Sequence, residues 1–361
     1  MMHWGGLMER KDMIRGFCYN EKDQDVFYRE FDHRLPDRII DGHVHSWKRE
    51  CLNIEKVEYE IYKKYKPWTD FDLMEQLTIE EFNECAGKLF PERKYQGMFF
   101  GLPFPQLDRK RSNEYILENA GKYKAGFYYM PGQYEDAREA QECWKLLERP
   151  GFLGFKPYPD LAHVEEGEVG IYDMLNASFL EFAEENGLNI MLHIPGKERL
   201  RSEKTRRELE DITSRYQNIR FLMAHAGRSF CFFDIEGSID FLVDKPNVWF
   251  DTALLNDPPV LEYLFRKVPS DRIVFGSDAP LAFTRGKDIC VNHKHYYVAG
   301  DMVPWGLSAM TEGLLDLTFY IYEEIRAILY ASKAVYGRGE CEHLNRIFYG
   351  NSRRMQIERG L

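Results

Sequence analysis

Eight short apolar runs, each typical of a β-strand, recur along this chain and constrain its fold more than any other feature. They cover residues 38–45, 95–102, 125–131, 152–159, 189–196, 219–227, 248–254 and 272–280. Helical patterns lie between several of them, at 172–187, 200–216 and 235–246. Because strands that alternate with helices form βαβ units, the pattern predicts a parallel sheet. Eight such strands favour an α/β fold of the closed (β/α)8 TIM-barrel type over a doubly wound sheet, since no GxGxxG motif follows the first run.

The length of 361 residues suits either two ordinary domains or one large barrel. The sequence contains no repeat, low-complexity tract or Pro/Gly/Ser-rich linker, so we expect a single domain over 1–361. Its barrel strands should lie within about 38–280, with a lid loop and C-terminal helices over 281–361. Two segments exceed a minimal barrel, namely 46–94, charged and partly helical, and 281–310. Loops at the carboxyl ends of barrel strands build active sites, so both segments are candidates to wall or cover one.

Charge and composition exclude several classes of partner. The net charge of −11 argues against nucleic acid, because phosphate backbones are bound by clusters of Lys and Arg. No apolar run approaches the ~18 residues that a membrane span requires, and the N-terminal residues lack the pattern of a secretory signal. The seven cysteines are scattered and form no CxxC motif. This usage predicts a cytoplasmic protein with free thiols and no disulfide framework.

Histidine, lysine and aspartate residues fall near the carboxyl ends of the predicted strands. The set comprises His43 and His45 in the first strand, Lys156 in the fourth, His193 in the fifth, His225 in the sixth and Asp278 in the eighth. In a barrel all these ends converge on one mouth, and side chains two residues apart on a strand share a face. Each residue alone suits an ordinary structural role, such as a buried hydrogen-bonded histidine. Together they indicate a site for zinc or a related divalent ion, because imidazole and carboxylate are its usual ligands.

The motifs IDGHVH, GFKPY, MLHIPG, MAHAG and VFGSDAP, followed by IFYGNSRRM at 347–355, resemble the amidohydrolase superfamily, in particular its amidohydrolase-related, decarboxylase-like branch. The resemblance covers most of residues 38–280. It implies that His43, His45, His193 and Asp278 hold a divalent metal, with zinc favoured, and that a water fills the open position. It also implies that His225 either activates this water or polarises the substrate. The metal would lower the pKa of the water toward ~7, and Asp278 would accept its proton.

Three residues are candidates for binding the substrate: Lys156, Arg228 and Tyr158. The guanidinium of Arg228, which directly follows the HAG motif, suits a substrate carboxylate, with an ordinary salt bridge as the equal alternative. Strand alternation points Lys156 into the barrel. There it is either carboxylated, bridging a second metal as in some branches of the superfamily, or cationic and available to a substrate carboxylate. We favour the cationic lysine and one metal ion over two.

Weaker pocket candidates are Thr252 and Trp305. The second HxH motif, His293 to His295, follows no strand pattern, so we expect it in a lid or on the surface. Apolar residues at 314, 315, 317, 319, 321, 322, 325, 328 and 329 make a wider stripe than one core-facing side of a helix requires. This stripe predicts burial against another subunit, and thus a homodimer or higher homo-oligomer. Packing under the 281–310 loop is the equal alternative.

These features together predict an enzyme. The favoured activity is a metal-dependent hydrolase that acts on a small polar, carboxylate-bearing substrate through a metal-activated water. A decarboxylase or hydratase on the same metal site is the alternative, because the branch contains all of these activities and a fold does not select among them. An inactive barrel used as a binding protein is a third possibility, and the intact ligand set disfavours it.

Overall fold

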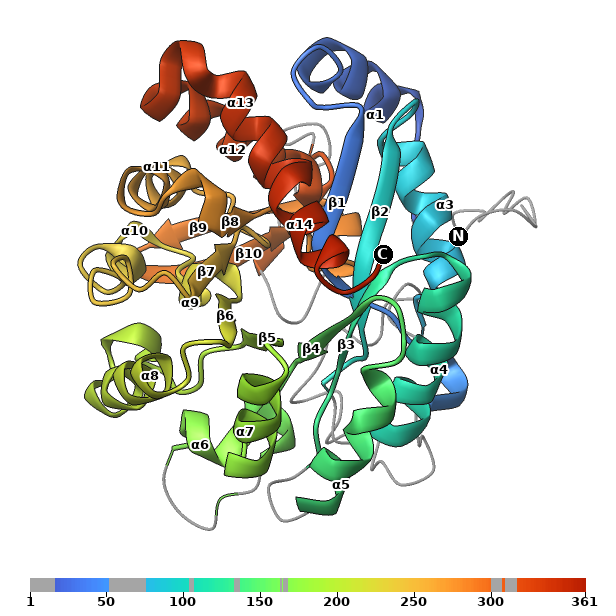
Figure 1. Ribbon diagram of the computed structural model, residues 1–361. Coiled ribbons are helices and arrows are strands. Elements are labelled where there is room, and N and C mark those ends of the chain that lie inside the picture. Colours follow the sequence, from blue (N-terminus) through green and yellow to red (C-terminus); the bar gives the residue numbers. More distant parts are fainter. Residues whose placement is uncertain are drawn as a thin grey trace, which may run out of the picture.

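All eight predicted strands are present, and they form one parallel sheet in sequence order (Figure 1). The structure, a computed structural model, describes residues 17–51, 76–103, 107–132, 137–162, 164, 168–299, 307–308 and 317–361. The strands are β1 (Arg38–His45), β2 (Lys94–Phe100), β3 (Gly126–Tyr129), β4 (Phe152–Phe155), β5 (Asn189–Leu192), β6 (Arg220–Met223), β7 (Val248–Asp251) and β8 (Ile273–Val274). Figure 1 shows them arranged around a ring, with helices outside it.

The ring closes between β1 and the segment that follows β8. Val44 forms a parallel bridge with Ala279, and the amide of Gly42 donates to the carbonyl of Phe275 at 2.8 Å. The amide of Asp278 donates to the carbonyl of His43 at 2.9 Å. The predicted (β/α)8 TIM barrel is therefore confirmed, and its closure fixes Asp278 opposite the two histidines of β1.

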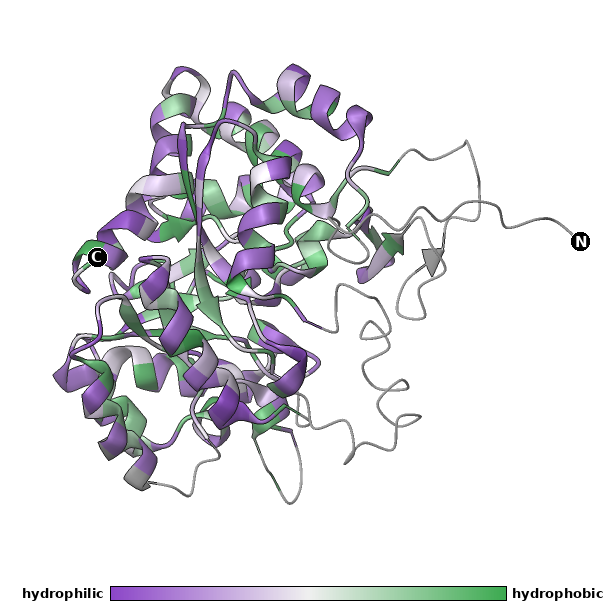
Figure 2. Ribbon diagram, turned by 90° about the vertical axis from the view of Figure 1, so that its right-hand side faces the viewer, coloured by the Kyte–Doolittle hydropathy of each residue, from purple (hydrophilic) through white to green (hydrophobic). Residues whose placement is uncertain are grey.

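Helices cover the outside of the barrel. They are α1 (Glu21–Val26), α3 (Ile79–Leu89), α4 (Arg109–Lys122), α5 (Ala137–Glu142), α6 (Ile171–Met174), α7 (Ala177–Glu185), α8 (Glu203–Arg215), α10 (Phe232–Ile235), α11 (Pro258–Lys267), α12 (Tyr320–Tyr336), α13 (Glu340–Asn345) and α14 (Asn351–Ile357). The single turn α9 (His225–Arg228), whose residues have positive φ values, instead follows β6 at the carboxyl end of the barrel. Figure 2 shows apolar strands inside and polar helix surfaces outside. This distribution follows from burying both faces of a parallel sheet, which makes its strands nearly continuous apolar runs.

Two of the three predicted helices between strands are present. The 172–187 pattern becomes α6 and α7, and the 200–216 pattern becomes α8. The prediction of a helix over 235–246 is wrong, because α10 ends at Ile235 and turns follow it. Gly237 has a φ of +69°, a left-handed conformation that ends a helix and that glycine adopts without steric cost.

The expected partly helical insertion contains α3, whose first turn is capped by Thr78 and Glu81 in a reciprocal capping box. Residues 52–75 of that insertion lie outside the described residues. The expected closing helix near the C-terminus is a π-helical turn, Arg346–Gly350, followed by α14. There the side-chain amide of Asn351 donates to the carbonyls of Ser270 and Ile273, which anchors this segment beside β8.

The segment 281–310 is not the irregular loop that we expected. Within its described part, β9 (Gly286–Val291) and β10 (Lys294–Ala299) form an antiparallel hairpin, and β11 (Leu307–Ser308) pairs with β10. The second HxH motif therefore straddles a hairpin turn, with His293 in the turn and His295 on β10. The sequence pattern fails here because the hairpin has little apolar alternation, and its outer residues are exposed.

The expectation that all cysteines are free thiols is wrong for two of them. Cys231, just before α10, and Cys290, on β9, form a disulfide. The other five cysteines, Cys18, Cys51, Cys85, Cys143 and Cys341, are free. Among the described residues, no helix is both long and apolar enough to cross a bilayer.

The wide apolar stripe near the C-terminus is buried largely by the chain itself. Its members on or just before α12, at 319, 321, 322, 325, 328 and 329, are all buried. The helix packs against α11, β9 and the turn at Leu281–Phe283. Positions 314 and 315 lie outside the described residues. The width of the stripe on α12 thus requires no second subunit, and the homo-oligomer stays a prediction.

Gly154 on β4 allows the close approach of β5 and supplies a test of the fold. A Cβ atom there would lie 1.9 Å from the carbonyl oxygen of Asn189, and the φ of Gly154 is +142°. We therefore expect Gly154→Ala to lower the free energy of unfolding by roughly 3 kcal/mol or more. Chemical denaturation measures this change. Gly121→Ala is the control, because a Cβ atom added there meets no atom within 4 Å apart from its chain neighbours and the backbone of its own helix. Equal stability of the two variants would contradict the observed β4–β5 approach.

Candidate metal centre

The predicted strand-end residues gather at the carboxyl end of the barrel, around a cavity of about 350 Å³. Its lining consists of His45, Leu102, Pro103, Tyr158, Asp160, His193, His225, Arg228, Asp278, Pro280, Leu281 and Tyr297. A larger cavity of about 790 Å³ lies at the start of β1 and β2 and contains none of the predicted site residues. The smaller cavity is therefore the candidate site, because chemistry rather than size distinguishes the two.

Asp278 is the residue on which the histidines converge. Its Oδ1 lies 3.2 Å from Nε2 of His43 and 3.1 Å from Nε2 of His45. Burial alone would raise the pKa of this carboxyl group. The positive charge of the adjacent His43 and the close approach of both imidazoles to the carboxylate instead hold the pKa of Asp278 well below its usual value. Asp278 is therefore ionised at neutral pH and presents a carboxylate to the cavity.

Three histidines of the site, His43, His45 and His225, each form a hydrogen bond through Nδ1 of the imidazole ring. Nδ1 of His43 lies 2.8 Å from Oδ2 of Asp251. Nδ1 of His45 lies 2.8 Å from the carbonyl of Gly101, and Nδ1 of His225 lies 2.9 Å from the carbonyl of Ala253. Since these partners only accept hydrogen bonds, each Nδ1 carries the proton when the ring is neutral. The Nε2 lone pairs are thereby left free to bind a metal ion.

The nitrogen and oxygen atoms of these side chains are suitable ligands for a divalent cation. Ligand atoms of His43, His225 and Asp278 all lie within 4.8 Å of one another. Nε2 of His43 is buried and forms no hydrogen bond, which suits an atom reserved for a metal. Burial lowers the pKa of His225 to about 4 and also lowers the pKa of His45, so both rings are neutral and able to ligate at pH 7.

The tightest group differs from the predicted ligand set, because it includes His225 in place of His45 and His193. His45 is nevertheless in contact with Asp278. His193 directly follows β5, and its ring centre lies 5.4 Å from that of His225. The structure thus brings all five predicted residues to one place, and the division of roles between His193 and His225 stays a prediction.

Lys156 points into the barrel, as the alternation of β4 predicts. Its side chain is fully buried, and Nζ has no hydrogen-bond partner among the described residues. Nζ instead lies over the rings of Tyr158 and Phe100, 4.8 and 5.1 Å from their centres. Burial lowers the pKa of this amine to about 7, although nearby carboxylates oppose the shift. The cationic state of this lysine and its contact with a substrate carboxylate stay predictions.

Arg228 and Tyr158 line the cavity as predicted binding residues should. Nη1 of Arg228 donates to the carbonyls of Ile194 and Gly196, at 2.9 and 3.3 Å. In the part of the chain that the structure describes, Arg228 forms no salt bridge, and its contact with a substrate carboxylate stays a prediction. The hydroxyl of Tyr158 lies 3.2 Å from Nε2 of His45.

The two weaker pocket candidates have different outcomes. The hydroxyl of Thr252 donates to Oε1 of Glu324 at 3.0 Å, and Thr252 does not line the cavity. Trp305 lies outside the described residues.

Sequence reasoning missed two buried aspartates that hold the candidate metal ligands in position. Asp251, the last residue of β7, accepts from the backbone amides of His225 and Ala253 in addition to holding His43. Asp41 on β1 accepts from the amides of His43 and Ser277, which links β1 to the segment after β8. The sequence contained a signal for each aspartate, since Asp251 ends an apolar run and Asp41 precedes His43 by two residues on one strand.

Asp251→Asn should weaken metal binding roughly 10- to 100-fold, because the carboxylate fixes the tautomer and orientation of His43. Titration of zinc against a chelator of known affinity measures the change. Asp244→Asn removes the same charge from an exposed turn and serves as the control. Unchanged zinc affinity in Asp251→Asn would show that His43 is not a ligand or needs no orienting partner.

A protein-family profile described as "Amidohydrolase" matches residues 40–288 of this sequence. No curated protein is significantly similar to the chain in sequence. Among solved structures, 5-carboxyvanillate decarboxylase from Sphingomonas paucimobilis matches with a TM-score of 0.56 at 10% identity, over 89% of this chain and 99% of that one. The 4-oxalomesaconate hydratase from Rhodopseudomonas palustris matches with a TM-score of 0.54 at 17% identity, over 89% and 96%. An amidohydrolase from Burkholderia multivorans with bound zinc matches with a TM-score of 0.53 at 13% identity, over 88% and 99%.

Proposed function

This chain belongs to the amidohydrolase family, and on that premise we propose that it is a metal-dependent hydrolase of a small, carboxylate-bearing substrate. One observation carries the proposal: the imidazoles of His43 and His225 and the carboxylate of Asp278 converge beside a cavity at the carboxyl end of the barrel. The solved structure of a similar protein contains zinc, which supports zinc as the ion here. His43, His45, His193 and Asp278 are the proposed ligands.

A divalent ion held there would act as a Lewis acid and lower the pKa of a water toward about 7. Asp278 is placed to accept the proton of that water and later to deliver it to the leaving group. Because its pKa lies well below its usual value, Asp278 is ionised at neutral pH and has an oxygen that can accept a proton. His225, whose Nδ1 is bonded to Ala253, keeps an unprotonated Nε2 for the substrate or the water.

The remaining polar groups of the cavity suit an anionic, compact substrate. Arg228 offers guanidinium hydrogens that its two backbone acceptors do not use, and Lys156, buried inside the barrel next to Tyr158, adds an amine. Burial raises the pKa of Tyr158 well above its usual value, so its hydroxyl keeps its proton and can donate. A volume of about 350 Å³ limits the substrate to a small molecule.

A lyase is the second candidate function. A decarboxylase and a hydratase have this fold, and the fold does not select among the reactions. A metal-replete screen in ¹⁸O water, with small lactones, esters, amides and unsaturated carboxylic acids, separates the two. A hydrolase should place the label in the carboxylate formed from the ester, lactone or amide, and this is the result that we expect. Label in a new alcohol on an unsaturated acid would instead establish a hydratase. Release of carbon dioxide without incorporated label would establish a decarboxylase and reject the hydrolase.

We further propose one metal ion per chain, with Lys156 uncarboxylated. An amine that is buried and near neutral pKa can hold a substrate carboxylate without bridging two ions. Elemental analysis after reconstitution with excess zinc and bicarbonate should give one equivalent. Two equivalents, the second of which is lost in Lys156→Ala, would contradict the one-metal proposal.

A further inference from the structure

The β9–β10 hairpin supplies a wall of the cavity that a minimal barrel would lack. Tyr297 on β10 lines the cavity together with Arg228 and Asp160. Its position on the strand faces Asp288 of β9 in the antiparallel register, two residues from His295. The rings of His295 and Tyr297 lie 4.6 Å apart, so both side chains project to the same face of the hairpin.

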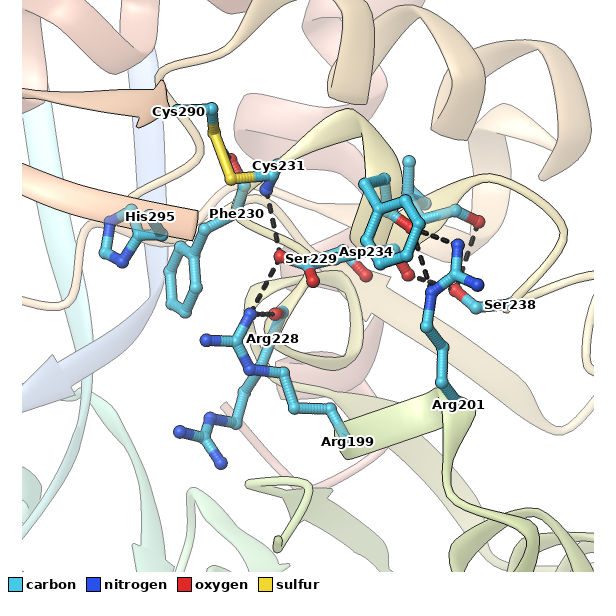
Figure 3. Close-up of polar contacts among 12 residues, drawn as sticks. Arg199, Arg201, Arg228, Ser229, Phe230, Cys231, Asp234, Ser238, Cys290 and His295 are labelled. Atoms are coloured by element: carbon cyan, nitrogen blue, oxygen red, sulfur yellow. Dashed lines mark hydrogen bonds and ion pairs between the residues drawn. A yellow bond between two sulfur atoms is a disulfide. The ribbon is translucent and has the colours of Figure 1, made fainter. Parts of the chain in front are cut away.

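A disulfide ties this hairpin to the loop that carries Arg228. Cys290 of β9 is bonded to Cys231, which lies three residues after Arg228 (Figure 3). Phe230, which directly precedes Cys231, stacks on His295 of β10, with ring centres 4.5 Å apart and planes 18° from parallel. Figure 3 shows the bond and the stacked pair side by side, so the hairpin and the loop after β6 contact each other through both.

Hydrogen bonds fasten the inner face of the hairpin to the barrel. Asp288 accepts a hydrogen bond from the hydroxyl of Tyr320 on α12, and its Oδ2 lies 2.9 Å from Nε2 of His295. Its backbone amide donates to Oδ1 of Asn256 at 3.0 Å. These contacts lie on β9 and at the inner face, whereas the end of the hairpin near its turn is exposed and contacts the loop after β6 through the disulfide and through the rings of His293 and Phe233, whose centres lie 4.5 Å apart. The disulfide is therefore the covalent restraint at the outer end.

We propose that Tyr297 is a substrate-positioning residue and that the Cys231–Cys290 disulfide sets the distance between Tyr297 and Arg228. This inference rests on the proposed function, because it assigns the hairpin to the substrate pocket of the same site. A tyrosine hydroxyl and a guanidinium that line the same cavity can both donate hydrogen bonds to one carboxylate. The two groups lie on separate segments of the chain, so the disulfide that joins these segments controls the distance between the hydroxyl and the guanidinium.

Reduction is the direct way to release the restraint. A phosphine cleaves the sulfur–sulfur bond with water, which leaves two thiols on the protein and the phosphine as its oxide. After cleavage, the outer end of the hairpin is restrained by noncovalent contacts alone, such as the Phe230–His295 stack. We expect faster hydrogen exchange over 286–299 and weaker binding of carboxylates in the cavity.

The first test compares tyrosines on the two faces of β10. The probe is isophthalate, a rigid ring whose two carboxylates are too far apart to bind the same ion together. It is titrated into zinc-loaded protein, and binding is measured by calorimetry. Tyr297→Phe keeps the ring and removes the hydroxyl, and we expect roughly tenfold weaker binding. Tyr296→Phe, on the opposite face, should bind as the unsubstituted protein does. Equal affinities for the two variants would overturn the positioning role, and so would absence of isophthalate binding to the unsubstituted protein at millimolar concentration.

The second test compares oxidised protein with phosphine-treated protein. It also compares the double variant Cys231→Ser/Cys290→Ser with Cys341→Ser, which replaces an exposed free cysteine and is the control. Reduction and the double substitution should each raise hydrogen exchange over 286–299 and weaken isophthalate binding several-fold. The control should do neither. Unchanged exchange and affinity after verified reduction would overturn the role of the disulfide.

Zinc content distinguishes this inference from the proposed function. None of the substituted residues in these tests is a proposed metal ligand, so every variant should keep its zinc. Full zinc content with no effect of the hairpin changes would reject only the hairpin inference. Absence of zinc from the unsubstituted protein would reject the metal-dependent function, while hydrogen exchange would still report on the hairpin.

Discussion

The double substitution His43→Ala/His45→Ala is expected to leave the metal site essentially empty. It removes two imidazoles whose Nε2 atoms lie 3.2 and 3.1 Å from Oδ1 of Asp278, and it leaves that carboxylate without its nearest partners. Zinc content measured by elemental analysis after reconstitution should fall from about one equivalent to nearly none, since the variant has lost two of the four proposed ligands of a tetrahedral site.

The matched control replaces two exposed histidines, His33→Ala/His293→Ala, and should keep its zinc. Near-ultraviolet circular dichroism confirms that the double variant of the site is folded, because the buried aromatic core is unchanged. A folded His43→Ala/His45→Ala protein with full zinc stoichiometry would place the metal elsewhere and reject the proposed ligands.

Asp278→Asn is expected to remove turnover even where zinc is retained. The asparagine occupies the same volume and can still offer an oxygen to the metal, but it cannot accept a proton. We expect kcat to fall by roughly 10²- to 10⁴-fold on the substrate that the isotope screen identifies, with a smaller change in KM. Turnover and zinc content are measured on the same samples, so that loss of metal is separated from loss of the base.

Asp271→Asn, at the start of the turn that precedes β8, makes the same chemical change outside the cavity and is the control. Turnover within a few-fold of the unsubstituted protein in Asp278→Asn would mean that another group, such as His225, accepts the proton.

The barrel and the gathering of the site residues could be predicted because both depend on local patterns. A strand buried on both faces is an apolar run whatever its surroundings, and a polar residue at its carboxyl end is therefore conspicuous. His193 in MLHIPG and His225 in MAHAG stand out for this reason. Their convergence then follows from the closure of the barrel.

The hairpin, the disulfide and the orienting aspartates could not be predicted in the same way. The hairpin is partly exposed on both sides, so its strands lack apolar alternation. The disulfide joins cysteines 59 residues apart, and their proximity depends on how the hairpin folds back. Asp251 was visible at the end of β7, but a single aspartate there is equally typical of a helix cap until its partners His43 and His225 are placed.

The backbone at the carboxyl end of the barrel has a thermodynamic consequence for any attempt to stabilise this protein. His225, Ala226, Arg228, Leu254 and Asp278 all have positive φ values between 46° and 64°, although none is glycine. Each such residue costs about 1 kcal/mol or more relative to an ordinary conformation. A selection for heat resistance alone would relax these turns, for example by glycine, and would move the groups that they aim into the cavity. Thermostability and catalytic competence should therefore oppose each other in this part of the chain.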